Sequence, residues 1–213
     1  MIGYRNSRIK RPKKTVIIST PRSASQHFCR QYKIDNKIKN LGELLNPRLY
    51  PQKQLTGEQY IQQQIDLWYN YDNTMCKIFP FHITNLINNC DQQQLTEYCK
   101  QIAEGCDKIV YLYRRDTTRQ VISSIISEKT DVWKPKRSKP DDINITPAQF
   151  ERYSMSILRN HKQVLEIKKQ LPGVSICSED YLQGSQFQKY KHQYENNDNY
   201  CYNLENIEQL YKL

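Results

Sequence analysis

The first group of residues that could do chemistry lies in residues 15–32, TVIISTPRSASQHFCRQY. A short β-branched run is followed by small polar residues around Arg22, and then by a segment typical of a helix. Small side chains let the backbone approach an anion, and the free N–H groups at a helix start favour negative charge. An arginine can bind a phosphate or sulfonate through two hydrogen bonds. The stretch predicts an anion site, with an ordinary serine-capped turn as the alternative.

The candidate ligands of this site combine one fixed charge, two hydroxyl groups and the backbone N–H groups of the turn. They are Arg22, Ser23, Ala24, Ser25 and Gln26. The segment lacks the Walker A pattern G-x-x-x-x-G-K-S/T, which binds a nucleoside triphosphate with magnesium. A nucleotide kinase of the P-loop type would need that lysine. Such a kinase stays an alternative function.

A second strand-to-helix junction with anion-binding residues follows the apolar run at 108–113, KIVYLY. Near-continuous apolarity predicts a central parallel strand with both faces covered. Arg115 stands at the tip of this strand, and Ser123 lies eight residues later in the next helix. An amphipathic helix with a charged first turn is the alternative. It explains the apolar stripe but not why a second anion-suited junction follows the first in order.

Together the two segments resemble the donor-binding motifs of sulfotransferases that use 3′-phosphoadenosine-5′-phosphosulfate (PAPS). In that family P-R/K-S-G-S/T-S/T holds the 5′-phosphosulfate; here Ala24 replaces the usual glycine and Gln26 the usual Ser or Thr. Arg115 and Ser123 have the spacing of the family's 3′-phosphate ligands. The pattern R-R-D-x-x-x-Q-x-x-S resembles most the bacterial trehalose-type and phage-encoded members. The resemblance covers residues 16–182.

The resemblance also implies a base for the acceptor hydroxyl. In trehalose-type members a glutamate soon after the first helix takes the proton, and Glu43 falls at that place; a solvated loop carboxylate is the alternative. Many sulfotransferases carry K-x-H-P after the second strand, but Phe79 replaces that histidine here. His82 is a second candidate base, or else a helix cap or a ligand contact. The catalytic candidates are therefore Glu43, His82 and Arg22, with Glu43 the preferred base.

The elements that must position these residues follow the order β-α-(α)-β-α-β-α-α-β. Capping boxes beginning at Thr56 and Thr146 predict two of the helices, and residues 40–47 are predicted to form a compact turn. This order predicts an α/β fold with three layers: a parallel sheet with helices on both faces, P-loop NTPase-like, with the ligand at the carboxyl ends of the strands. The 213 residues predict a single domain with a core at 14–183, a long basic loop at 128–142 and a polar extension at 184–213.

Composition narrows the classes of partner. A formal charge of +10 indicates an anionic ligand or partner. A basic nucleic-acid-binding protein is an alternative, but the charge is scattered and no such motif is found, so we expect no nucleic-acid partner. Seven cysteines without paired spacing indicate neither a disulfide framework nor a metal site. The unpaired cysteines and the lack of a long apolar run fit best with a cytoplasmic protein without a membrane span.

The expected function is transfer of the sulfuryl group from PAPS to a hydroxyl of a small-molecule or glycan acceptor, with a carbohydrate or glycolipid implied by the resemblance. Such a reaction needs neither a metal nor a covalent enzyme intermediate, because positioning and charge stabilisation do most of the work. The sequence does not specify the acceptor or the oligomeric state, and a homodimer is compatible with it.

Overall fold

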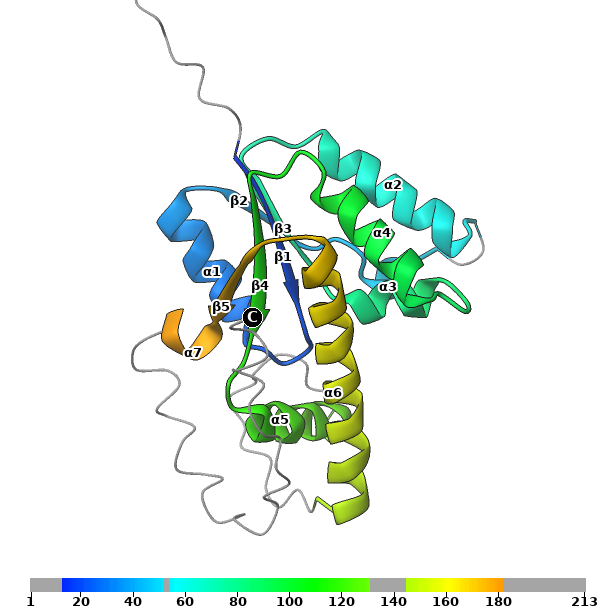
Figure 1. Cartoon of the computed structure of the whole chain (residues 1–213), viewed down its shortest axis with the longest axis vertical. Coiled ribbons are helices and arrows are strands. Elements are labelled where there is room, and N and C mark those ends of the chain that lie inside the picture. The colour runs from blue at the N-terminus through cyan, green and yellow to red at the C-terminus, as the bar shows by residue number, and fades with distance from the viewer. Residues whose placement is uncertain (1–12, 52–53, 131–144, 182–213) are drawn as a thin grey trace, which may run out of the picture.

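The computed structural model describes residues 13–51, 54–130 and 145–181. Its five strands are β1 (Lys14–Ser19), β2 (Lys39–Glu43), β3 (Thr74–Ile78), β4 (Lys108–Tyr113) and β5 (Val174–Cys177). They form one sheet in the order β2-β3-β1-β4-β5, and all paired neighbours are parallel (Figure 1). The predicted α/β class with a parallel sheet is confirmed.

Helices cover both faces of this sheet, as Figure 1 shows. On one face lie α1 (Ser25–Asn36) and α7 (Ser178–Tyr181); on the other lie α2 (Gly57–Tyr69), α3 (Pro80–Leu86), α4 (Gln92–Ala103) and α6 (Pro147–Gln170). Neighbouring strand residues alternate between the two cores. Val16 and Ile18 join the larger core around Trp68, whereas Ile17 packs with Phe28 of α1. Burial on both faces explains why these strands are apolar runs.

The strand β2 corrects the sequence prediction, which placed a compact turn at residues 40–47. Its sequence KNLGE shows neither an apolar run nor alternation. The strand lies at the edge of the sheet, and none of its residues is fully buried, so no apolar pattern is required. Lys39 and Asn40 pair with Thr74 and Met75, and the register then shifts so that Glu43 lies opposite Lys77. Glu43 is thus the last residue of a strand and not a loop residue.

The helix α5 (Thr117–Thr130) lies at the carboxyl edge of the sheet, below the strand ends in Figure 1. It follows β4 directly and packs against the first half of α6. The shared core consists of Val121, Ile122, Ile125, Phe150 and Ile157. This packing fixes α5 across the ends of the strands, so that residues of its first turns face the loop after β1.

Several predictions concern other parts of the chain. The basic loop was predicted to begin at residue 128, but α5 continues to Thr130, so the helix is longer than predicted. Residues 131–142 of that loop and the extension at 184–213 lie outside the described residues. The single-domain organisation stays a prediction. Within the described ranges, no helix combines the length and apolarity needed to cross a membrane. The capping boxes at Thr56 and Thr146 are confirmed, and Asp91 caps α4 in the same way.

Gly57 marks a close approach between α2 and the end of α3. A Cβ added there would overlap the Leu86 carbonyl oxygen, and a backbone atom cannot move aside cheaply. We expect Gly57→Ala to lower the free energy of unfolding by about 1–3 kcal/mol, measured by urea denaturation. Glu58→Ala, at the exposed neighbouring position, should change it by less than about 0.5 kcal/mol. Equal, small effects of both changes would contradict this packing.

Candidate functional site

The loop between β1 and α1 has an unusual backbone. Arg22 and Ala24 both adopt left-handed conformations, with φ of 59° and 60°, which L-residues rarely occupy. A tight turn of this kind is the setting in which successive backbone N–H groups form an anion-binding nest. The conformation also gives a physical reason for glycine at position 24 in the resembling motif, because glycine adopts it without strain.

The first backbone N–H groups of α1 have no side-chain cap, unlike those of α2, α4 and α6. Capping boxes close those three helices, and α1 has no acidic residue in its first turn. Ser23, just before it, is fully buried, and its hydroxyl has no hydrogen-bond partner among the described residues. Unpaired donors at a helix start are satisfied by water or by an anionic ligand, so this terminus fits an anion.

Arg114, the residue after β4, and Ser123 of α5 both contact Arg22 of this loop. Arg22 Nε donates to Ser123 Oγ at 2.8 Å, across 101 residues of sequence. Arg114 Nη1 donates to the Arg22 carbonyl oxygen at 3.4 Å. Burial, and then the positive charge of Arg114, lower the pKa of Arg22. Both effects disfavour the charged arginine, and a bound anion would offset them.

Arg115, the predicted 3′-phosphate ligand, is engaged by the chain's own carboxylates. Its guanidinium donates to both Asp180 oxygens, at 3.0 and 2.8 Å, and its backbone N–H donates to Glu179 at 3.1 Å. Burial alone would raise the pKa of Glu179, but hydrogen bonds from Cys177 and the backbone lower it. Glu179 therefore sits as a carboxylate at the start of α5, where Asp116 also accepts from the N–H of Arg119. An anion would have to take Asp180's place on Arg115.

The predicted base Glu43 forms a half-buried ion pair. Lys77 Nζ lies 2.9 Å from Glu43 Oε1 and donates to Ser25 Oγ at 3.2 Å. Gly42, with φ of 79°, and the shifted strand register direct Glu43 toward Lys77 rather than along the edge. Lys77 therefore joins the predicted base to the first residue of α1. The alternative of a solvated loop carboxylate is wrong.

His82, the second candidate base, lies next to this pair on α3. It is buried, and its ring stands edge-on to Phe79 and Phe81, with centroids 5.1 and 4.4 Å away. Burial lowers the pKa of His82 to about 4, although the negative charge of Glu43 acts in the opposite direction. The N-cap of α3 is Phe79, so His82 does not cap the helix. It is a neutral neighbour of the ion pair at pH 7.

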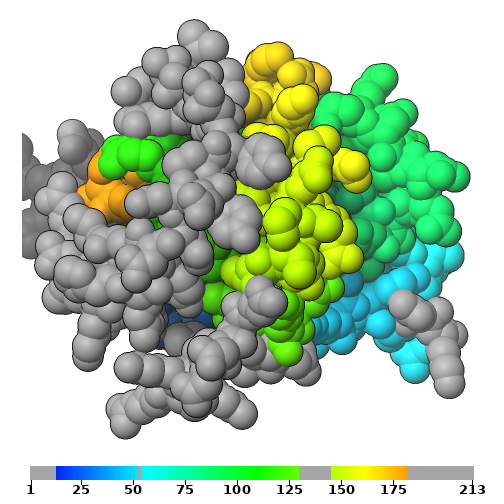
Figure 2. Space-filling model, turned by 90° about the horizontal axis from the view of Figure 1, so that it is seen from below, coloured from blue at the N-terminus to red at the C-terminus, as the bar shows by residue number. Residues whose placement is uncertain are grey.

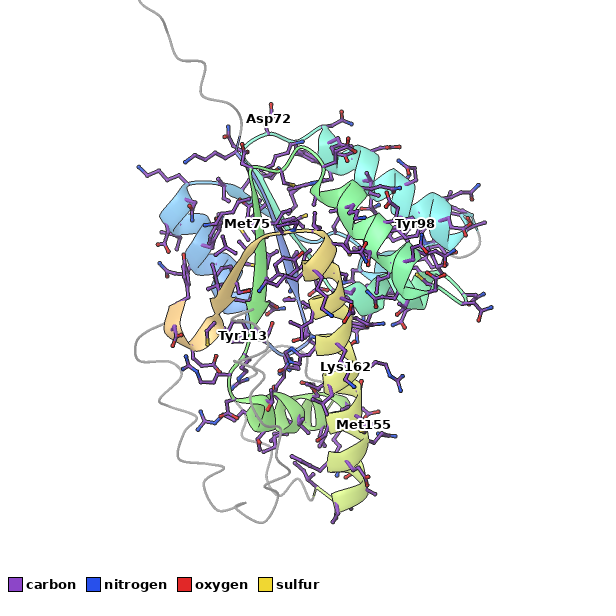
Figure 3. All side chains as sticks on the ribbon, viewed as in Figure 1. Asp72, Met75, Tyr98, Tyr113, Met155 and Lys162 are labelled. Carbon is purple, nitrogen blue, oxygen red and sulfur yellow. The ribbon has the colours of Figure 1, made fainter. Side chains whose placement is uncertain are left out.

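The predicted site residues thus gather at one edge of the sheet. Tyr113, labelled in Figure 3, ends β4 at this edge, while Asp72 lies at the opposite one. Figure 2 shows the molecule from below, with α6 in yellow, α4 in green and α2 in cyan to one side, and α7 in orange to the other. Ser23 is buried in the loop and Ser25 is buried at the start of α1, whereas Gln26, the next residue of α1, is exposed. Arg115 and Ser123 have different partners, Asp180 and Arg22.

Three contributors were not among the predicted site residues: Arg114, Gln120 and Glu179. Lys77 is the lysine of the K-x-H-P pattern, which the resemblance places on the transferring sulfonate, but its ion pair with Glu43 was not predicted. Arg114 and Gln120 belong to the second motif, but their contacts depend on tertiary structure. No cluster of three His, Cys, Asp or Glu side chains suited to a metal occurs in the part of the chain that the structure describes.

Comparisons with known proteins add little to this geometry. No family model matches the chain, and no curated protein matches it. Among solved structures, the chain is similar to deoxyadenosine kinase from M. mycoides with bound dCTP, at 14% identity and a TM-score of 0.35, over 84% of this chain and 95% of that one. A similarity of this size carries no argument about activity.

The left-handed conformation of Ala24 generates a stability prediction. Ala24→Gly should raise the free energy of unfolding by about 0.5–1 kcal/mol, because relief of left-handed strain exceeds the entropy that glycine adds to the unfolded chain. Ala148→Gly is the control: it is exposed in the first turn of α6, so it should lower stability by about 0.5–1 kcal/mol. Urea denaturation measures both. A loss of stability in Ala24→Gly would contradict the loop conformation.

Proposed function

We propose that this chain is a sulfotransferase that uses PAPS and sulfates a hydroxyl of a carbohydrate or glycolipid acceptor. The observation that carries the proposal is the 2.8 Å hydrogen bond from Arg22 to Ser123. These two residues come from the two motifs on which the resemblance rests. A single nucleotide with a 5′-phosphosulfate and a 3′-phosphate requires both motifs to meet, and they do so at the carboxyl ends of adjacent strands, where α/β proteins bind ligands.

The donor would be held by residues of three elements. The N–H groups of residues 23–26 and the Arg22 guanidinium would bind the 5′-phosphosulfate. Ser123 and Arg115 would bind the 3′-phosphate, with Arg115 exchanging Asp180 for the phosphate. That ion pair is about half exposed, with side chains 44% and 57% accessible, and surface pairs of this kind are worth only about 0–1 kcal/mol. Replacing Asp180 by the phosphate on Arg115 therefore costs little free energy.

The reaction then needs a base and charge stabilisation. The acceptor oxygen attacks sulfur, the new O–S bond forms, and the bond from sulfur to the 5′-phosphate oxygen breaks. Glu43 takes the hydroxyl proton, and the electron pair leaves on adenosine 3′,5′-bisphosphate. Arg22 and Lys77 stabilise the negative charge that develops on the transferring and leaving groups. Lys77 can do so because its ammonium group already bridges Glu43 and Ser25.

A nucleotide kinase is the second candidate, and one observation favours it. Lys77 Nζ lies 3.2 Å from Ser25 Oγ, so a neighbouring strand supplies a lysine that the loop itself lacks. A kinase using ATP with magnesium would place this lysine on the transferred phosphate. The two candidates differ in what Arg115 and Ser123 do, because ATP has no 3′-phosphate.

The 3′-phosphate assignment is tested by Arg115→Ala and Ser123→Ala. We expect Arg115→Ala to weaken binding of adenosine 3′,5′-bisphosphate by about tenfold to a hundredfold, since it removes a charge-assisted contact, and Ser123→Ala to weaken it less. Neither change should affect adenosine 5′-monophosphate. Isothermal titration at fixed salt measures both ligands. Arg159→Ala, an exposed arginine on α6, is the charge-matched control. Equal weakening of both nucleotides would contradict the assignment.

The base assignment is tested by Glu43→Gln and His82→Asn. We expect Glu43→Gln to reduce sulfuryl transfer by about 10²–10⁴-fold, because the amide cannot accept the proton, while affinity for adenosine 3′,5′-bisphosphate stays close to wild type. His82→Asn should retain appreciable activity. The assay follows release of adenosine 3′,5′-bisphosphate from PAPS with trehalose and simple glycosides as acceptors. The reverse order of the two variants would show that His82 is the base.

A further inference from the structure

A sealed chain of hydrogen bonds runs from α6 through α5 to the anion-binding loop. Gln120 Nε2 donates to Thr20 Oγ1 at 2.8 Å and to the carbonyl oxygen of Pro21. Gln120 Oε1 lies 3.2 Å from His161 Nε2. Gln120, Thr20 and His161 are 0%, 1% and 2% exposed. Water therefore cannot reach these hydrogen bonds, which end on Thr20 and Pro21, the two residues before Arg22.

The direction of these hydrogen bonds is fixed by the Pro21 carbonyl oxygen, which can only accept, so the Gln120 NH₂ faces the loop and Oε1 faces His161. Burial lowers the pKa of His161 to about 4, so the imidazole is neutral at pH 7, and the tautomer with its proton on Nε2 donates to Gln120. A donor at that position requires the Gln120 oxygen to face α6, which turns the amide NH₂ toward the loop. With the amide reversed, its oxygen would face the carbonyl oxygen of Pro21 and leave a buried acceptor without a donor, which is costly.

The loop needs such support because its two left-handed residues are strained, and strained turns persist only where their surroundings over-determine them. Arg22 and Ser123 also belong to the proposed ligand site, so their mutual contact can change when a nucleotide binds. The contacts of Gln120 lie behind the loop and face no ligand. They can hold the same loop conformation with and without a ligand.

We propose that Gln120, oriented by His161, is a positioning residue that keeps the β1–α1 loop in its anion-binding conformation. Neither residue touches the nucleotide. Through Thr20 and Pro21, both determine the orientation of the Arg22 side chain and of the N–H groups that follow it. The identity of the ligand rests on the proposed function, whereas the support of the loop does not.

The experiment compares nucleotides that use the loop with one that does not. Adenosine 3′,5′-bisphosphate and adenosine 5′-monophosphate carry the 5′-phosphate that the loop would bind, and adenosine 3′-monophosphate lacks it. Gln120→Met should weaken the first two by about tenfold, equivalent to ~1.4 kcal/mol, and leave the third near its wild-type affinity. Ser154→Ala is the control, since its buried hydroxyl donates only within α6, to the Phe150 carbonyl oxygen.

A second pair of variants separates positioning from general stability. His161→Leu removes the donor that orients the amide and should reproduce the loss for the two 5′-phosphate nucleotides. His161→Gln keeps a donor at a similar distance from the backbone and should restore most of the affinity. This pair also decides the matter if Gln120→Met does not fold. Urea midpoints of all variants show whether affinity follows stability.

Two results would overturn the positioning role: equal weakening of all three nucleotides, or no change in any of them. Failure of the proposed function has a different signature. In that case the wild-type protein would not prefer adenosine 3′,5′-bisphosphate to the monophosphates. The effect of Gln120→Met is then read on ATP, whose 5′-phosphates would use the same loop.

Discussion

The structure depends on how the loop after β1 is held against α5. β1 is the central strand, with β3 on one side and β4 on the other, so the chain segments that follow these strands diverge around its carboxyl end. This is the position at which open α/β sheets form ligand crevices. Because α5 follows β4 directly, its first turns reach the loop, and the hydrogen bond between Arg22 and Ser123 joins two segments that are distant in sequence.

Charge at this edge is balanced internally in a way that suits ligand exchange. Lys77 pairs with Glu43, and Arg115 pairs with Asp180. Burial lowers the pKa of Arg114, while the charge of Glu179 opposes that shift. A nucleotide phosphate could replace the carboxylate on Arg115 at little cost, because that pair is partly exposed. The Lys77–Glu43 pair is more buried, and it holds a carboxylate beside the cation expected to stabilise the reaction.

Much of the fold could be predicted, and the reasons are local. The apolar runs of β1 and β4 and the capping boxes at Thr56 and Thr146 are strong signals that depend on few neighbours. The strand β2 could not be predicted, because its residues KNLGE carry no periodicity and it exists through pairing with β3. The contact of Glu43 with Lys77 was missed for the same reason. The role of Gln120 depends on His161, which lies 41 residues away, and no short pattern encodes that contact.

The proposed function requires that the site bind a nucleotide with a 3′-phosphate. The most direct measurement is isothermal titration of the wild-type protein with adenosine 3′,5′-bisphosphate, adenosine 5′-monophosphate and ATP with magnesium, at one salt concentration. Charge-assisted contacts to the 3′-phosphate predict that the bisphosphate binds at least about tenfold more tightly than the monophosphate and more tightly than ATP. Equal affinities for the bisphosphate and the monophosphate, or a clear preference for ATP with magnesium, would contradict a 3′-phosphate site.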